Sequence, residues 1–293
     1  MKNKTLFTIL FATLAVYGCS SDDGGGAAGS GGTAGSGGTA GSGGSAGGGG
    51  AGGSAGEGGA GGSAGEGGSG GGMPPGGVVV YEQKFESLDD MSATALSDDG
   101  WVFFANVFDA GDLVNPKFSY SGLAPNATVS PSDTFISAVV SGEGDVPQGA
   151  QQLSVFNDYN CCGPGTTNEG HFNGTDRVEM NVFQEPFNQI SPIAADDVGK
   201  TVTFTFDAKQ GNIEGATTAL AFIKTLDPGA SFAQTNFVTA DTTSVGATWD
   251  GFIISLEITA DLVNQILQFG FSNTASDFEG SGVFYDNVLV VLE

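Results

Sequence analysis

The chain has 293 residues, 51 of them glycine, and its 33 acidic residues against eight basic ones give a formal net charge of −25 at pH 7. A surface this acidic repels the phosphate backbone, so the composition argues against nucleic acid as a partner. It favours solubility and offers divalent cations many carboxylates.

The first 18 residues have the pattern of a bacterial secretory signal. Lys2 and Lys4 form a short basic start, and an apolar run from residue 6 to residue 16 follows. This run is too short for a transmembrane helix, which needs about 20 residues. We therefore expect residues 1–18 to be a signal peptide.

Residues 16–19, Val-Tyr-Gly-Cys, resemble the lipobox of bacterial lipoproteins. The resemblance implies cleavage before Cys19 and lipidation of its thiol, and Ser20 resembles the residue that directs sorting to an outer membrane. The alternative is an ordinary signal peptide that ends near a cysteine. We expect a protein of the bacterial cell envelope that is lipid-anchored at the outer membrane and faces either the periplasm or the outside.

Residues 19–77 form a segment of low sequence complexity. From residue 24 onward it consists of glycine, alanine and serine with a few other residues, and the hexad Gly-Gly-Thr-Ala-Gly-Ser at 31–36 recurs at 37–42. Such a composition cannot bury enough apolar surface to fold. It predicts a disordered, glycine-rich tether, and about 55 flexible residues have a root-mean-square span of roughly 40 Å.

Residues 78–293 are predicted to form a single all-β domain, because this length suits one sandwich and helical spacing is limited to a turn or two within 259–267. Short apolar or alternating runs, separated by Gly, Pro, Asn and Asp, predict a two-sheet sandwich with a core formed mainly by the 22 phenylalanines. The predicted strands are 78–86, 101–108, 118–122, 134–140, 152–157, 177–184, 201–208, 219–225, 236–240, 252–258, 267–272 and 283–291.

Several short stretches, spread over nearly all of 78–293, occur together in a characteristic order: Phe-Glu at 85–86, Asp-Gly-Trp at 99–101, Gln-Gly at 148–149 before Leu-Ser-Val at 153–155, the run 199–209, Thr-Trp at 248–249 and Phe-Tyr-Asp-Asn-Val at 284–288. In this the region resembles the jelly-roll carbohydrate-binding modules of the xylan- and glucan-binding type. The resemblance implies a jelly-roll β-sandwich that binds a polysaccharide.

Asp286 lies within an otherwise apolar final strand, where a buried carboxylate needs a metal ion or backbone donors as partners. The family resemblance implies that Glu86 and Asp286 are two ligands of a structural calcium ion, which takes about six to eight oxygen ligands. Asp145 and Glu143 are candidates for a further ligand. The alternative is that Glu86 and Asp286 accept backbone N–H bonds without a metal.

The polar stretch from 157 to 173 is the sequence's best candidate for sugar binding, because loops carry function and sugars require aromatic and hydrogen-bonding partners. Its candidate ligand residues are Asn157, Asp158, Tyr159 and His171. The alternative is a hairpin loop without a binding role. Trp101 and Trp249 each begin a strand and match family positions that pack on the core, so both are expected to be structural.

Cys161 and Cys162 are adjacent and, after an export signal, lie in an oxidising compartment, which favours a vicinal disulfide. Their Cα atoms are about 3.8 Å apart, below the usual disulfide range, so such a bond stiffens its loop. The open alternatives are a rigid ledge for a ligand, a redox-labile switch, or two free thiols.

The sequence shows no catalytic motif. Nucleophilic catalysis would have to use His171, the only histidine, and a lyase acting on acidic polymers would need more than the six basic residues of 78–293. We expect a non-catalytic, surface-tethered lipoprotein that binds a neutral glycan. The alternatives are an adhesive or structural surface protein and, less favoured, a glycan lyase or hydrolase.

Overall fold

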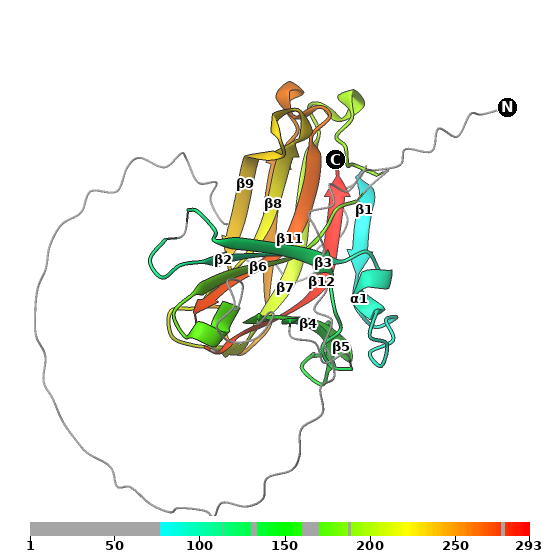
Figure 1. Cartoon of the computed structure of the whole chain (residues 1–293). Helices are drawn as coiled ribbons and strands as arrows, with labels where there is room; N and C mark the ends of the chain where they lie inside the picture. The colour runs from blue at the N-terminus through cyan, green and yellow to red at the C-terminus, as the bar shows by residue number, and fades with distance from the viewer. Residues whose placement is uncertain (1–76, 113, 130–133, 160–169, 187–188, 277–278) are drawn as a thin grey trace, which may run out of the picture. The chain divides into compact units, whose positions relative to one another are not determined.

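A computed structural model describes residues 77–112, 114–129, 134–159, 170–186, 189–276 and 279–293. In this part of the chain two antiparallel sheets face each other (Figure 1). This confirms the predicted fold, an all-β, two-sheet sandwich of the jelly-roll type, and each of the twelve predicted strands is present. The signal peptide, Cys19 and the tether lie outside the described residues.

Sheet A has the strand order β10-β7-β12-β5-β4. β1 also belongs to it and pairs with residues 288–292 of β12, whereas β5 pairs with residues 283–285 of the same strand. The C-terminal strand β12 therefore contacts three strands, and its partner β1 is the first strand of the domain (Figure 1, red and cyan). The bounds are β1 Val78–Gln83, β4 Thr134–Ser141, β5 Gln151–Tyr159, β7 Thr201–Ile213, β10 Asp250–Glu257 and β12 Ser281–Leu292.

Sheet B has the strand order β3-β2-β6-β11-β8-β9, with β6 and β11 at its centre. All of its pairings are antiparallel. The bounds are β2 Val102–Phe108, β3 Phe118–Leu123, β6 Arg177–Gln184, β8 Thr218–Asp227, β9 Ala233–Asp241 and β11 Ile266–Ser276.

Helical structure is as scarce in the described residues as the sequence predicts. The segment 259–267 contains one 3-10 turn, Ala260–Leu262, whereas the short helix α1, Ala95–Asp98, was not predicted. Further 3-10 turns are Gly170–Asn173, Ala195–Asp197 and Pro228–Ala230. Within the described part of the chain no helix has the length and hydrophobicity needed to cross a bilayer.

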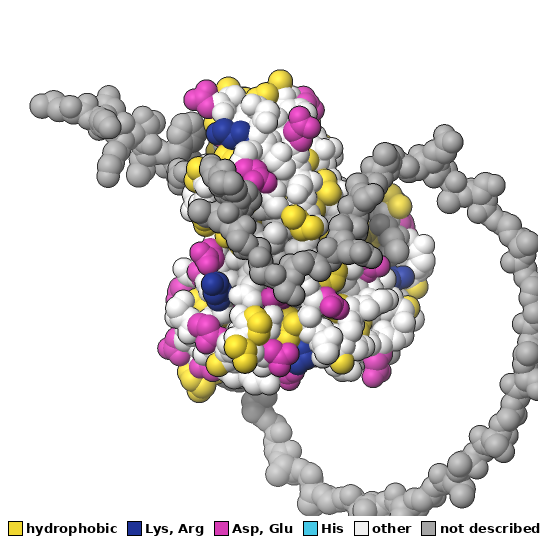
Figure 2. Space-filling model, turned by 180° about the vertical axis from the view of Figure 1, so that it is seen from behind, with side chains coloured by type: hydrophobic (Ala, Val, Ile, Leu, Met, Phe, Trp, Pro, Cys, Tyr) yellow, Lys and Arg dark blue, Asp and Glu magenta, His cyan; other side chains and the backbone are white. Residues whose placement is uncertain are grey.

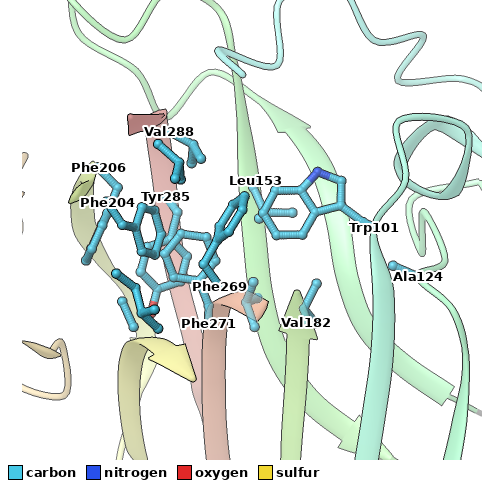
Figure 3. Close-up of a cluster of buried hydrophobic side chains, with 14 of the residues drawn as sticks. Trp101, Ala124, Leu153, Val182, Phe204, Phe206, Phe269, Phe271, Tyr285 and Val288 are labelled. Carbon is cyan, nitrogen blue, oxygen red and sulfur yellow. The ribbon is translucent and has the colours of Figure 1, made fainter. Parts of the chain in front are cut away.

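The core between the sheets is aromatic, as the alternating pattern predicts. On β7, Phe204 and Phe206 point inward and meet Phe269 and Phe271 of β11 (Figure 3). Tyr285 of β12 stacks on Phe271 with ring centroids 3.7 Å apart. The period-2 side-chain alternation of strands explains why these rings share one face of each sheet.

Trp101, directly before β2, is fully buried and stacks on Phe271 with a centroid distance of 6.2 Å. It also contacts Phe85, so it links the segment after β1 to the centre of the sandwich. The expected structural role of Trp101 is confirmed.

Replacing Phe271 by alanine should lower the free energy of unfolding by about 3–5 kcal/mol, because it removes a buried ring that contacts four other aromatic side chains. Chemical denaturation measures this. Phe232→Ala is the matched control, since Phe232 is 56% exposed, and its effect should stay within about 0.5 kcal/mol. Equal losses for the two variants would contradict this description of the core.

Candidate functional site

Glu86 follows β1 and is held by backbone donors of another segment. Its Oε1 accepts hydrogen bonds from the backbone N–H of Ala150 (2.6 Å) and of Gln151 (2.8 Å). Gly149 permits this approach, because a Cβ there would lie 2.4 Å from the same oxygen and its φ is +71°. These two bonds match the alternative in which Glu86 accepts backbone N–H bonds without a metal. Both go to Oε1, so the second carboxylate oxygen, Oε2, is left for another ligand.

Asp286 is fully buried in β12. Its Oδ1 accepts a hydrogen bond from the backbone N–H of Asn287 (2.5 Å), while its Oδ2 has no hydrogen-bond partner among the described residues. Burial raises the pKa of Asp286 to about 8, against the opposing effects of the Asn287 N–H and the Gln152 side chain, and the negative charges of Asp207 and Glu86 raise it further. The structure thus brings Asp286 and Glu86 within electrostatic reach of each other.

A third carboxylate, Asp207 of β7, adjoins this pair. Its Oδ2 accepts hydrogen bonds from the side-chain amides of Gln148 and Asn287, each at 2.7 Å. The other side-chain atom of Gln148, Oε1, is buried and has no partner among the described residues. We call Glu86, Gln148, Asp207 and Asp286 the acidic corner.

Two residues next to the acidic corner have left-handed backbone conformations. Phe85 precedes Glu86 with a φ of 59°, and Asn287 follows Asp286 with a φ of 48°. A left-handed conformation is costly for a bulky residue such as phenylalanine, and such strain gathers at functional positions. The conformation of Phe85 therefore costs local stability beside Glu86, whereas asparagine tolerates the left-handed region at position 287.

The side chains of the acidic corner do not by themselves form a complete metal site. Among the described residues, no group of three or more acidic, histidine or cysteine side chains has the geometry of a metal site. The further candidates contribute little, since Glu143 is ion-paired with Lys209 (3.0 Å) and Asp145 is exposed. Calcium binding by Glu86 and Asp286 stays a prediction.

Three of the four predicted ligand residues are buried inside the sandwich. Asn157 donates to the carbonyl oxygens of Val178 (2.6 Å) and Asn273 (3.3 Å), and its Oδ1 lies 2.9 Å from Nε2 of the fully buried His171. Asn157 thereby ties β5 of sheet A to β6 and β11 of sheet B, a structural task that its polarity did not reveal.

Tyr159 is also fully buried, and its ring lies 6.2 Å from that of Tyr120. Asp158 differs, because alternation along β5 turns it to the outer face of sheet A, where it is half-exposed. Cys161 and Cys162 lie outside the described residues, so their disulfide stays a prediction.

Trp249 lies outside the aromatic core and is partly exposed. Its Nε1 donates to the carbonyl oxygen of Glu143 (3.0 Å), and the Lys209 ammonium lies 5.9 Å from its ring centroid. It therefore holds a loop of sheet A in place and does not pack on the core.

The outer face of sheet B carries a second cluster of aromatic and polar side chains. Phe183 of β6 and Phe222 of β8 are buried but do not belong to the core, because their neighbours Val182 and Ile223 point inward. Gly270 of β11 pairs with both and separates them with a bare backbone. We call the outward side chains Glu179, Asn181, Phe183, Glu185, Phe222, Lys224 and Gln268 the sheet B face.

Lys224 occupies the centre of the sheet B face. Its Nζ lies 5.0 Å from the ring centroid of Phe183 and 5.0 Å from that of Phe222, a distance typical of cation–π contacts. Burial lowers the pKa of Lys224 to about 8, against the raising effect of the carboxylates of Glu179 and Glu185. With a pKa of about 8 this amine stays mainly protonated at pH 7, and it sits beside two aromatic rings.

Amides and carboxylates surround this centre. The Glu179 carboxylate accepts from the side-chain amides of Asn106 (3.1 Å) and Asn181 (3.0 Å), and Glu185 accepts from that of Gln268 (2.5 Å). Burial raises the pKa of Glu185. Gln268 Oε1 is buried with no hydrogen-bond partner among the described residues. Sugar recognition requires aromatic rings that are surrounded by fixed hydrogen-bond donors and acceptors.

No family model matches the chain, and no curated protein matches it. Solved structures similar to it include a cyclase from Fischerella sp. (TM-score 0.42, 15% identity, 75% of this chain, 98% of that one). The CBM22-1 and GH10 modules of a Clostridium thermocellum xylanase in complex with xylohexaose give a TM-score of 0.37 and 14% identity over 72% of this chain, which spans 28% of that one.

A third similar structure is the CBM22-1 xylan-binding domain of Xyn10C from Paenibacillus barcinonensis, with a TM-score of 0.34 and 10% identity over 74% of this chain and 95% of that one. At such identities the site has to be interpreted from the chemistry of its own residues.

The buried Asp286 predicts an unusual pH dependence in calcium-free protein. Its pKa is about 8 in the folded state against an ordinary value of 3.8, so the folded state binds this proton more tightly and the contribution of Asp286 to stability decreases as pH rises from about 4 to 8. Asp286→Asn should therefore gain stability relative to the parent as pH increases over this range.

Chemical denaturation of both proteins at several pH values, with a chelator present, measures the difference. The control is Asp261→Asn at an exposed position. A difference between parent and Asp286→Asn that does not change with pH would contradict the prediction.

Proposed function

We propose that this protein is a non-catalytic glycan-binding lipoprotein that is anchored at Cys19 and carries its binding site on a tethered β-sandwich. The observation that carries the proposal is the sheet B face, where two phenylalanine rings, an ammonium, two carboxylates and two amides lie together outside the core. The resemblance of the sequence to carbohydrate-binding modules supports the same assignment.

Each group of the sheet B face has a role in this proposal. Sugars present apolar C–H faces, which pack on exposed aromatic rings, and hydroxyl rims, which need donors and acceptors. Phe183 and Phe222 are only 7% and 0% exposed, so in this proposal they hold Lys224 through its contacts with both rings, and Lys224 meets the ligand. Lys224 supplies donors, and Gln268 Oε1 supplies a buried acceptor that a hydroxyl would satisfy. Because such an acceptor is costly to leave unpaired, its hydrogen bond favours the bound state.

The ligand of the sheet B face is a neutral glycan in this proposal. Glu179 and Glu185 stand against a single base, Lys224, so the face repels acidic polymers. The chain as a whole has the same sign, with 33 acidic residues against eight basic ones, and acidic side chains are spread over the side of the domain drawn in Figure 2.

The absence of catalysis is part of the proposal. Glycoside hydrolysis uses a pair of carboxylates, of which one must deliver a proton. On the sheet B face both carboxylates accept hydrogen bonds from amides of the same face, and the only histidine is buried beside Asn157. These contacts favour binding over proton transfer.

A structural calcium at the acidic corner completes the proposal. Glu86 and Asp286 would hold the ion, and the unpaired oxygens of Asp286 (Oδ2) and Gln148 (Oε1) fit a cation that accepts carboxylate and amide oxygens. When bound, the ion would neutralise adjacent carboxylates and stabilise the junction of β1, β5, β7 and β12.

A glycan array with the soluble Cys19→Ser form tests the binding proposal. We expect binding to one or more neutral polysaccharides, and Gln268→Ala or Lys224→Ala should weaken it about tenfold, the effect of losing about 1.4 kcal/mol. Gln189→Ala, at an exposed glutamine, is the matched control. Binding to no glycan would favour an adhesive role, and release of reducing sugar would show an enzyme.

Calcium should raise the melting temperature of the same protein by several degrees, and EDTA should reverse the shift, because the ion relieves the repulsion of the buried Asp286 by Asp207 and Glu86. Calorimetry with and without calcium measures this. Asp286→Asn should abolish the response, whereas Asp261→Asn should keep it. An identical melt in calcium and in EDTA would contradict the calcium site.

A further inference from the structure

The outer face of sheet A contains a hollow of about 490 Å³ that lies away from both the sheet B face and the acidic corner. This volume is within the range of small-molecule sites, about 300–1,000 Å³. We call it the β5–β12 hollow, and the side chains that characterise it are Phe156, Asp158, Asn212, Glu279 and Phe284.

Glycines create the hollow. On β12, Val283 and Tyr285 point into the core, so Gly282 and Phe284 belong to the outer face. Gly211 of the neighbouring β7 is so close that a Cβ on it would lie 2.7 Å from the Gly282 carbonyl oxygen. With no side chain on Gly211 and Gly282, the sheet surface is bare between rings that rise on either side.

The walls of the hollow are aromatic. Phe284 pairs with Ser154 of β5, and the continuation of this register puts Phe156 beside Gly282. Both phenylalanines are partly exposed and absent from the core cluster. Partly exposed rings beside a bare backbone can pack on the apolar face of a ligand.

The rim of the hollow is acidic. Asp158 and Glu279 contribute carboxylates, Asn212 contributes an amide, and none of the described lining residues is basic. Burial raises the pKa of Asp158, so a nearby positive charge would stabilise its ionised form. On this face Lys209 is ion-paired with Glu143 at 3.0 Å, and its Nζ lies 6.0 Å from the Phe284 ring.

The position of Glu279 is fixed by the turn after β7. Thr217 Oγ1 donates to its Oε2 (3.5 Å), and a Cβ on Gly215 would lie 2.7 Å from its Oε1. Gly215 has a φ of +61°, which favours glycine. The carboxylate therefore rests against the backbone of this turn and does not extend freely into solvent.

From this geometry we propose that the β5–β12 hollow binds a protonated amine carried on a sugar ring, as in a glucosamine-containing glycan. The carboxylates of Asp158 and Glu279 attract the ammonium, the rings of Phe156 and Phe284 pack on the sugar, and the Asn212 amide serves a hydroxyl. A bare metal ion is a poorer fit, since the described residues offer no cluster of three metal-ligating side chains here.

Isothermal titration of the soluble Cys19→Ser protein with a short glucosamine oligosaccharide tests the proposal, with its N-acetylated counterpart as the matched ligand. The amine form should bind at least about tenfold more tightly, because acetylation removes the charge. Asp158→Asn with Glu279→Gln should weaken binding by about tenfold or more, and Phe284→Leu, which keeps apolar volume, should weaken it less.

The control must separate this site from general attraction, because a net charge of −25 attracts any polycation. Glu257→Gln with Asp261→Asn makes the same change of charge at exposed positions elsewhere and should keep the affinity. Gln268→Ala on the sheet B face should also keep it, so this site is tested independently of the proposed neutral-glycan site. Equal binding of both oligosaccharides, or equal losses in the two double variants, would overturn the proposal.

Discussion

The pairing of the first strand with the last is the constraint on which the sandwich depends. β12 runs between β7 on one side and β1 and β5 on the other, so it joins the β10–β7 pair to the β5–β4 pair and to β1. The same strand sends Tyr285 into the aromatic core and turns Phe284 outward. Core, acidic corner and hollow are therefore all fixed by the register of one strand.

Much of this fold could be predicted from the sequence, because alternating side chains reveal strands directly. Val202, Phe204 and Phe206 are buried as their spacing indicates. The proximity of Glu86 and Asp286 followed from the family-like order of motifs. In contrast, the helix Ala95–Asp98 is only one turn long, and nothing in its composition distinguishes it from a loop.

The sheet B face could not be predicted, because its residues come from strands that the sequence does not show to be neighbours. Alternation indicates that Glu179 and Lys224 point away from the core, but only the pairing of β6 and β8 with β11 brings them together. Asn157 and His171 show the opposite problem. Their polarity predicts a surface loop, yet Asn157 is hydrogen-bonded to His171 and to carbonyl oxygens of β6 and β11 between the two sheets, where a polar side chain is costly unless it is bonded.

The adjacency of the two ends of the domain has a mechanical consequence. Val78 pairs with Leu292, so a chain anchored through its N-terminal segment transmits any pulling force into β1 at that end. A force along the strand loads the β1–β12 hydrogen bonds together, in shear, and not one after another. Directly beyond β1, Glu86 is bonded to the backbone of Ala150 and Gln151. The acidic corner thus lies at the end of β1 where the force passes to the rest of the domain. It would hold this end in place when a bound ligand resists the pull.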